Sequence, residues 1–121
     1  MFNSEQQEIY ARYKNPENSG HLEKPHFSLD GSNVFCGDLV HLEGCINERG
    51  ELTTLMHTSQ ACAICTAATD LLPELYLGKT IQEIKSSSSK LITDRLGIPL
   101  SPTRLKCALL GLETLKQAEV K

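Results

Sequence analysis

The spacing of apolar and polar residues predicts an antiparallel hairpin in the first half of the chain. Residues 39–47 alternate, with Val40 and Leu42 on one face and polar residues on the other, which is typical of a half-buried strand. A turn at 48–51 leads into a second predicted strand at 52–58. Gly44 leaves a gap on the apolar face, where a larger side chain is expected.

Steps of three and four residues between apolar positions predict two main helices after the hairpin. The clearer stripe runs from Ala61 to Leu75. The second helix is predicted after Ser101 and Pro102, which fit an N-cap followed by proline at the first helical position. Its expected buried stripe is Leu105, Ala108, Leu109, Leu112 and Leu115.

Three shorter helices complete the predicted helical content. Ser4 and Gln7 fit a capping box for the first, which ends at Asn15–Pro16 and has Ile9, Tyr10 and Tyr13 on its apolar face. The other two are predicted at 80–85 and 90–96. Between the first helix and the hairpin, residues 17–33 are rich in Gly, Pro, Asn and Ser, which predicts a loop or a short irregular edge strand.

Length and composition indicate a single domain spanning residues 1–121, with a core of Leu, Ile, Val and Ala. The formal net charge of −3 argues against a nucleic-acid-binding surface. Charge is uneven, because residues 1–78 carry 4 basic and 11 acidic side chains whereas residues 79–107 carry 6 basic and 2 acidic. The basic stretch is interpreted either as a solvated helix face or as a docking surface for an acidic partner.

The N-terminus begins with a polar stretch, so neither a signal peptide nor a membrane span is expected, and the predicted location is cytoplasmic. In such a reducing compartment the five cysteines are free thiols, metal ligands or catalytic groups rather than disulfides. The chemistry of the chain is therefore sought among its thiols.

Local context separates the cysteines by expected role. Cys65 falls on the apolar stripe of its helix, whereas Cys62 lies off it and enters the first helical turn if Ser59 is the cap. Spacing alone allows Cys62 and Cys65 to form a redox pair, but no parallel strand-helix-strand pattern accompanies them. Cys62 is therefore the available thiol of this helix.

Two further cysteines have neighbours that suggest chemistry. Gly37 permits a backbone turn that directs Cys36 and Asp38 toward one ion, although Asp38 alternatively satisfies backbone donors in a tight turn. Cys107 lies in the second turn of the last helix, off its main stripe, where Arg104 and Lys106 are expected to lower its pKa.

Three thiols and one carboxylate suffice for a four-coordinate zinc site. The same residues admit other functions. One is a purely structural zinc domain, in which the metal only holds the fold together. Another is a cysteine hydrolase that uses one thiol with His41 or His57.

The order and spacing of several segments resemble the IscU/SufU family (the NifU-type N-terminal domain) of iron-sulfur cluster assembly scaffolds over nearly the whole chain. Residues 13–20 (YKNPENSG) match that family's Tyr-x-Asn-Pro-x-Asn-x-Gly segment. The other matching segments, in order, are Cys36-Gly37-Asp38, a hairpin ending in Cys62, residues 78–80 (GKT) and residues 100–107 (LSPTRLKC).

The resemblance implies an α+β fold in which a three-stranded antiparallel sheet packs against about five helices. It implies a site of Cys36, Asp38, Cys62 and Cys107 that holds a transient [2Fe-2S] cluster or zinc. The implied partners are a pyridoxal-phosphate cysteine desulfurase, which supplies sulfur, and apo iron-sulfur acceptor proteins. Cys36 is the first candidate for the sulfur acceptor, because a glycine-flanked loop reaches into a partner's active site more easily than a helix, and Cys62 is the second.

The chain departs from the family pattern at several positions. Ala61 replaces a usual Gly, His57 stands where an aromatic residue is common, and Cys45 and Cys65 are additional. Before Cys107 the chain lacks both the Leu-Pro-Pro-Val-Lys segment and the His of IscU-type members, which puts docking of an Hsp70-type chaperone in doubt.

The segment before Cys107 is more similar to the SufU branch, whose members are zinc-dependent sulfur acceptors. The chain nevertheless lacks the insertion typical of that branch. Both subtypes therefore remain open.

Overall fold

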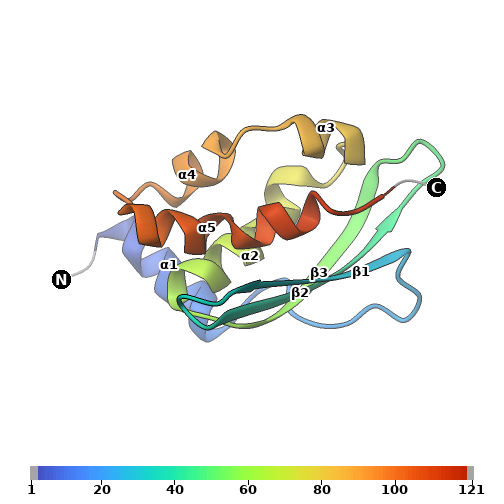
Figure 1. Ribbon diagram of the computed structural model, residues 1–121. Helices are drawn as coiled ribbons and strands as arrows, with labels where there is room; N and C mark the ends of the chain where they lie inside the picture. The colour runs from blue at the N-terminus through green and yellow to red at the C-terminus, as the bar shows by residue number, and fades with distance from the viewer. Residues whose placement is uncertain (1–2, 120–121) are drawn as a thin grey trace.

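The computed structural model describes residues 3–119. Its three strands form one antiparallel sheet in the order β1-β2-β3, and the helices lie on one side of it (Figure 1). This confirms the predicted α+β fold with a three-stranded sheet and five helices. In chain order the elements are α1 (Ser4–Lys14), β1 (Phe27–Asn33), β2 (Asp38–Ile46), β3 (Leu52–Gln60), α2 (Ala63–Tyr76), α3 (Ile81–Ser86), α4 (Lys90–Leu96) and α5 (Pro102–Leu115).

The sheet confirms the predicted hairpin and adds an edge strand. Val40 and Leu42 are buried on the helix-facing side of β2, as the alternation predicts, and β3 extends two residues beyond the prediction, to Gln60. β1 is a regular seven-residue edge strand within the segment predicted as loop or irregular strand. Its Phe27 pairs with Gly44, and a Cβ at Gly44 would lie 2.2 Å from the Phe27 ring. The aromatic ring of the neighbouring strand thus fills the gap at Gly44.

The first helix differs from its prediction in both cap and buried face. The capping box is formed by Asn3 and Gln6, one residue earlier than Ser4 and Gln7, with each side chain accepting the other's backbone N–H. Ile9 is buried as predicted, but Tyr10 and Tyr13 are exposed and Arg12 is buried instead. The reason is an ion pair that the apolar pattern does not reveal, between Arg12 and a buried aspartate of α2.

The central helix α2 packs against α1, α5, α4 and β3, so it is buried on most sides. Its N-cap is Cys62 and not Ser59, because Ser59 belongs to β3. The Cys62 Sγ accepts the backbone N–H of Cys65 at 3.4 Å. Cys62 is therefore at the boundary of the helix and not in its first turn.

The last helix has the predicted cap but a rotated buried face. Ser101 accepts the N–H of Arg104, and Pro102 is the first helical residue. Leu105, expected to be buried, is 36% exposed, whereas Cys107, expected off the stripe, is only 5% exposed. The face that α5 packs against α2 and β1 passes through Cys107. α4 matches its prediction, and α3 starts one residue later than predicted, with Thr80 as its cap.

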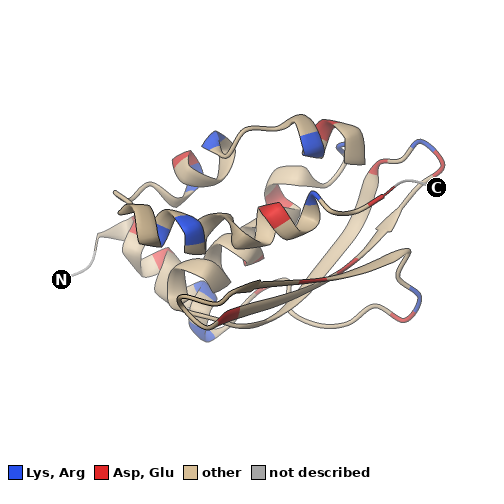
Figure 2. Ribbon diagram, viewed as in Figure 1, with Lys and Arg blue, Asp and Glu red and all other residues tan. Residues whose placement is uncertain are grey.

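Charged residues are distributed as the sequence indicates, with basic side chains on α3, α4 and the first half of α5 (Figure 2). Part of this basic stretch is neutralised internally, since Arg95 binds Glu8 and Lys90 binds Asp94. None of the helices within residues 3–119 combines the length and the apolar character needed to cross a bilayer.

Candidate metal centre

Residues from two separate segments, the stretch Cys36-Gly37-Asp38 and helix α5, converge at the end of the sheet nearest the start of α2. Cys36 comes from the turn between β1 and β2, Asp38 is the first residue of β2, and Cys107 comes from α5. One ligand atom from each of these three residues lies within 4.8 Å of the other two. The Cys107 thiol approaches Cys36 with Sγ atoms 3.4 Å apart. We call these three residues the thiol-carboxylate cluster.

The β1-β2 turn places Cys36 at the surface. Asn33 and Asp38 form the last pair of the β1-β2 ladder, and the N–H of Cys36 donates to the Asn33 carbonyl at 3.2 Å. Gly37 has a φ of +69°, a conformation that side chains with a Cβ rarely adopt. The glycine therefore permits the chain to reverse direction between the thiol of Cys36 and the carboxylate of Asp38.

Asp38 links the cluster to Cys62. Its side chain is buried, and Oδ1 accepts the backbone N–H of Cys62 at 2.9 Å. Its other oxygen, Oδ2, is 3.9 Å from the Cys62 Sγ. Asp38 thus accepts a backbone donor from a distant segment and not from its own turn, and its carboxylate lies beside the thiols. Cys62 is exposed next to the cluster but outside the set of mutually close ligand atoms.

The structure corrects the expected electrostatics at Cys107. Burial raises the pKa of this thiol well above its usual range, and its contacts with Cys36 and Asp38 raise it further. Arg104 and Lys106, expected to lower the pKa, are exposed, and the Lys106 ammonium lies 5.6 Å from the centre of the Phe35 ring instead. Cys107 is therefore a protonated thiol until a metal or a partner displaces its proton.

The remaining cysteines lie outside the thiol-carboxylate cluster. Cys65 is fully buried on the apolar side of α2, as predicted, and burial raises its pKa to about 12, with smaller contributions from Asp38 and Cys62. Cys45 contacts the carbonyl of Lys24 with its thiol, at 3.7 Å. All five cysteines are free thiols.

The histidines considered for a cysteine hydrolase have other partners. His57 is buried between Ser59 Oγ and Asp70 Oδ1, at 2.8 and 2.9 Å from its two ring nitrogens. Both nitrogens of His41 contact carboxylates. In residues 3–119 neither ring is hydrogen-bonded to a cysteine, so the geometry gives no thiol-imidazole pair.

The sequence reasoning missed the residue that organises the interior near the site. Asp70 of α2 is fully buried and binds Arg12, His57 and the backbone N–H groups of Glu17 and Asn18. It thereby ties the segment after α1 to α2 and β3. The position of Asp70 among small and apolar residues of a predicted helix indicates a buried carboxylate. A buried carboxylate requires hydrogen-bond or ionic partners, so this position was the sequence signal for its role.

Comparisons with known proteins agree with this architecture. The family model of the NifU-like N terminal domain matches residues 4–121. The chain is 26% identical over 113 residues to the iron-sulfur cluster assembly scaffold protein IscU of Buchnera aphidicola, covering 91% of this chain and 87% of that protein. It is 24% identical over 115 residues to IscU of Escherichia coli, covering 93% of this chain and 88% of that protein.

Solved structures show the same fold. A putative iron-sulfur cluster assembly scaffold protein for the SUF system from Fervidobacterium islandicum superposes with a TM-score of 0.79 at 25% identity, covering 96% of this chain and 98% of that one. The N-terminal part of a NifU-like protein from Brucella abortus superposes with a TM-score of 0.67 at 19% identity, covering 94% of each chain. The chain therefore belongs to the NifU-like N-terminal domain family, the family of the IscU and SufU iron-sulfur cluster assembly scaffolds.

Proposed function

We propose that this protein accepts sulfur from a cysteine desulfurase, assembles a transient [2Fe-2S] cluster and passes it to apo iron-sulfur acceptor proteins. The proposed ligands are Cys36, Asp38, Cys62 and Cys107. The observation that carries the proposal is that Cys107 of α5 lies beside the distant pair Cys36 and Asp38, with ligand atoms of the three residues within 4.8 Å of one another. Soft thiolates are the ligands that iron-sulfur clusters and zinc prefer, and this donor set fits both.

Cys36 is the proposed first sulfur acceptor. Its thiolate attacks the outer sulfur of the desulfurase persulfide, a new S–S bond forms on Cys36, and the S–S bond within the desulfurase persulfide breaks. The electron pair leaves with the desulfurase thiolate, so no external reductant is needed for this step. Exposure of Cys36 on the β1-β2 turn supports this order, since the attacking thiol must enter a partner's active site.

Cys62 is the second candidate acceptor. It is exposed at the N-cap of α2, where its Sγ accepts the backbone N–H of Cys65. Cys107 is buried and contacts Cys36, so it is proposed as a metal ligand and not as the first sulfur acceptor.

Asp38 is proposed to keep the cluster exchangeable. A carboxylate oxygen binds soft iron or zinc less tightly than a thiolate, so one coordination position of the metal is weakly bound. One of its oxygens already accepts the N–H of Cys62, and the other lies toward the Cys62 thiol. The carboxylate is therefore held at the junction of the proposed ligands.

The surface beside Cys36 is suited to docking of the desulfurase. Val34 and Phe35 are largely exposed on the same turn, and Lys106 lies over the Phe35 ring. Exposed apolar side chains next to a reactive group are typical of interaction sites. Docking of an Hsp70-type chaperone is not proposed, because the segment before Cys107 departs from the IscU-type pattern, and the cytoplasmic location stays a prediction.

Persulfide mapping tests the sulfur-transfer step. The protein is mixed with a cysteine desulfurase and cysteine, and each thiol is examined by mass spectrometry. We expect the persulfide on Cys36, with Cys62 labelled when Cys36→Ser removes the first acceptor. Cys45→Ser is the matched control, because Cys45 lies outside the thiol-carboxylate cluster. Label confined to Cys107 would contradict the proposed order.

A second candidate function is that of a zinc-dependent sulfur acceptor of SufU type. The structural similarity to a protein for the SUF system and the residues preceding Cys107 favour it. Anaerobic reconstitution with iron(II), cysteine, a desulfurase and a thiol reductant, which supplies electrons for reducing persulfide sulfur to sulfide, separates the candidates. A scaffold gives the ultraviolet-visible and Mössbauer spectra of a [2Fe-2S] cluster, a zinc-dependent acceptor takes sulfur without building a cluster, and a structural zinc domain takes no sulfur.

A further inference from the structure

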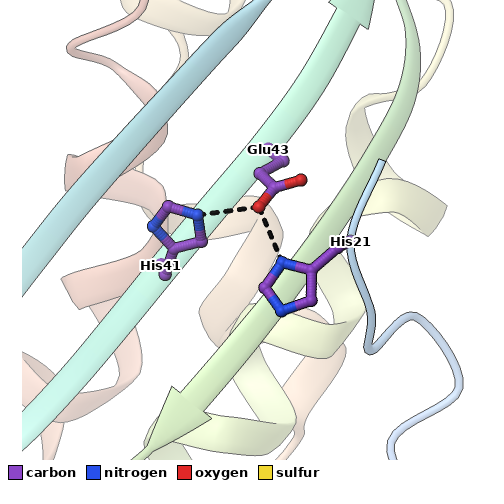
Figure 3. A group of neighbouring side chains, drawn as sticks. All are labelled: His21, His41 and Glu43. Atoms are coloured by element: carbon purple, nitrogen blue, oxygen red, sulfur yellow. Dashed lines mark hydrogen bonds and ion pairs between the residues drawn. The ribbon is translucent and has the colours of Figure 1, made fainter. Parts of the chain in front are cut away.

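A second group of metal-binding side chains lies on the face of the sheet away from the helices. The Nδ1 of His21 is 2.8 Å from Glu43 Oε2, and the Nε2 of His41 is 2.9 Å from the same oxygen (Figure 3). One ligand atom of each residue lies within 4.8 Å of the other two. These three residues, the histidine-carboxylate cluster, share no residue with the thiol-carboxylate cluster.

The fold brings these residues together in two ways. His41 and Glu43 are two positions apart on β2, so both project from the face opposite Val40 and Leu42. The segment before β1 pairs with the free edge of β3, where Gly20 N–H donates to the His57 carbonyl at 3.0 Å. The chain then places His21 beside the two strand residues, as Figure 3 shows.

Neighbouring groups orient two of the three ligands, the half-buried His41 and the buried Glu43. Asp30 of β1 is paired with His41 in the sheet, and its Oδ1 lies 2.8 Å from the His41 Nδ1. A carboxylate on one imidazole nitrogen directs the other nitrogen toward a metal, an arrangement typical of histidine ligands. The backbone N–H of Leu22 donates to Glu43 Oε1 at 2.7 Å, which leaves Oε2 facing both histidines.

The histidine-carboxylate cluster is accessible from solution. The side chain of His21 is 67% exposed, whereas that of Glu43 is 10% exposed. A groove of about 610 Å³ runs along the same sheet and has Asp30 and His41 in its wall. An ion can therefore enter without unfolding any element, and an exogenous ligand can reach it from the groove.

We propose that His21, His41 and Glu43 form a second site, for a divalent transition metal of the Zn²⁺ type. Two imidazoles and one carboxylate are ligands that Zn²⁺ prefers, at about 2.0–2.2 Å, and three protein ligands leave one coordination position open. Binding displaces the protons that now lie between the histidines and Glu43, so Glu43 Oε2 and both nitrogens turn from mutual hydrogen bonding to the ion. Asp30 is the positioning residue for His41.

Zinc stoichiometry and Co²⁺ spectra test the proposal on the full chain at about pH 8, where displacement of these protons is favoured. We expect two equivalents of Zn²⁺ per chain and one in His21→Gln. Because His21 is exposed, this substitution leaves the fold intact, which circular dichroism checks. His26→Gln is the matched control, since His26 is another exposed histidine whose Nδ1 accepts the N–H of Ile46 and which lies outside the cluster.

Co²⁺ distinguishes the two sites. The thiol-carboxylate cluster gives sulfur-to-cobalt charge-transfer bands, whereas the histidine-carboxylate cluster gives only ligand-field bands. We expect His21→Gln and His41→Gln to remove the ligand-field bands of the histidine-carboxylate cluster and to keep the charge-transfer bands. We expect Asp30→Asn to lower the metal affinity of the histidine-carboxylate cluster by about 10- to 100-fold at an unchanged unfolding midpoint.

A Zn²⁺ stoichiometry that is the same in the wild type and in both histidine variants would overturn the proposal. The three side chains would then be a hydrogen-bonded group without a metal. This result does not bear on the thiol-carboxylate cluster, whose charge-transfer bands report it separately.

Discussion

Two buried aspartates of this protein, Asp70 and Asp38, have opposite surroundings. Asp70 is 0% exposed, and its two oxygens accept from Arg12, from His57 and from two backbone N–H groups. Asp38 is 2% exposed, and its carboxylate accepts from the backbone and thiol of Cys62 and contacts the Cys107 thiol. The first carboxylate is saturated with charged and backbone donors, whereas Oδ2 of the second lies beside thiols, which are themselves ligands for a metal.

The difference between these surroundings distinguishes a carboxylate that stabilises the fold, Asp70, from one that is suited to a ligand, Asp38. Burial raises the pKa of Asp70, but the hydrogen bonds from His57, from the N–H groups of Asn18 and Glu17 and from Arg12 lower it by more, so it remains ionised. Such a carboxylate holds elements together and has no free capacity. A buried carboxylate with few partners is costly for the fold and is retained where a ligand completes its surroundings.

The largest effect is expected when the saturated carboxylate is removed. Asp70→Ala leaves Arg12 and His57 without a buried partner, so we expect the free energy of unfolding to fall by about 3–5 kcal/mol. Urea unfolding followed by circular dichroism measures it. Asp94→Ala is the matched control, because Asp94 pairs with Lys90 on the surface, where an ion pair contributes about 0–1 kcal/mol. Equal decreases in the free energy of unfolding in Asp70→Ala and Asp94→Ala would contradict the stabilising role assigned to the buried Asp70.

A smaller effect on stability and a clear effect on transfer are expected at the other aspartate. Asp38→Ala removes the acceptor of the Cys62 N–H, which costs about 1 kcal/mol of unfolding free energy. We expect cluster transfer to an apo-ferredoxin to slow on the order of tenfold, which corresponds to about 1.4 kcal/mol. The reason is that the weakly bound carboxylate ligand, through which the cluster is proposed to exchange, is absent. Unchanged transfer kinetics would count against the role proposed for Asp38.

The smallest effect concerns the surface end of the Asp70 network. Two hydrogen bonds from Arg95 lower the pKa of Glu8 to about 2, and Arg12 adds to this against the effect of burial. A carboxyl whose pKa is lowered on folding stabilises the protein above its unfolded pKa, and this contribution is lost as pH falls from about 4.5 toward 2.

Because Glu8 is partly exposed, we expect this pH-dependent contribution to be only about 1 kcal/mol. Unfolding midpoints measured across that pH range should fall less steeply in Glu8→Gln than in the wild type. Glu119 is exposed, so Glu119→Gln serves as the control. An identical slope in wild type and Glu8→Gln would show that the Arg95 pair contributes nothing to acid stability.

Patterns confined to one element were predicted well. The alternation of β2, the stripe of α2 and the cap of α5 follow from local spacing and side-chain chemistry, so they are read without knowledge of the fold. Two predictions of a buried helix face, which depend on neighbouring elements, were wrong. The buried face of α1 is shifted by the Arg12–Asp70 pair, and α5 buries Cys107 in place of Leu105.

The amino-acid sequence by itself determined the helices and the hairpin, the resemblance to a scaffold family and the candidate thiols, but not the regular strand β1. Only the tertiary structure decided which side chains meet. It places Cys36 and Asp38 beside Cys107, sets Cys62 at the edge of that cluster, and brings His21 to His41 and Glu43. The physical reason is that local spacing fixes the direction of a side chain on its own element, whereas contacts between distant segments depend on how whole elements pack and pair.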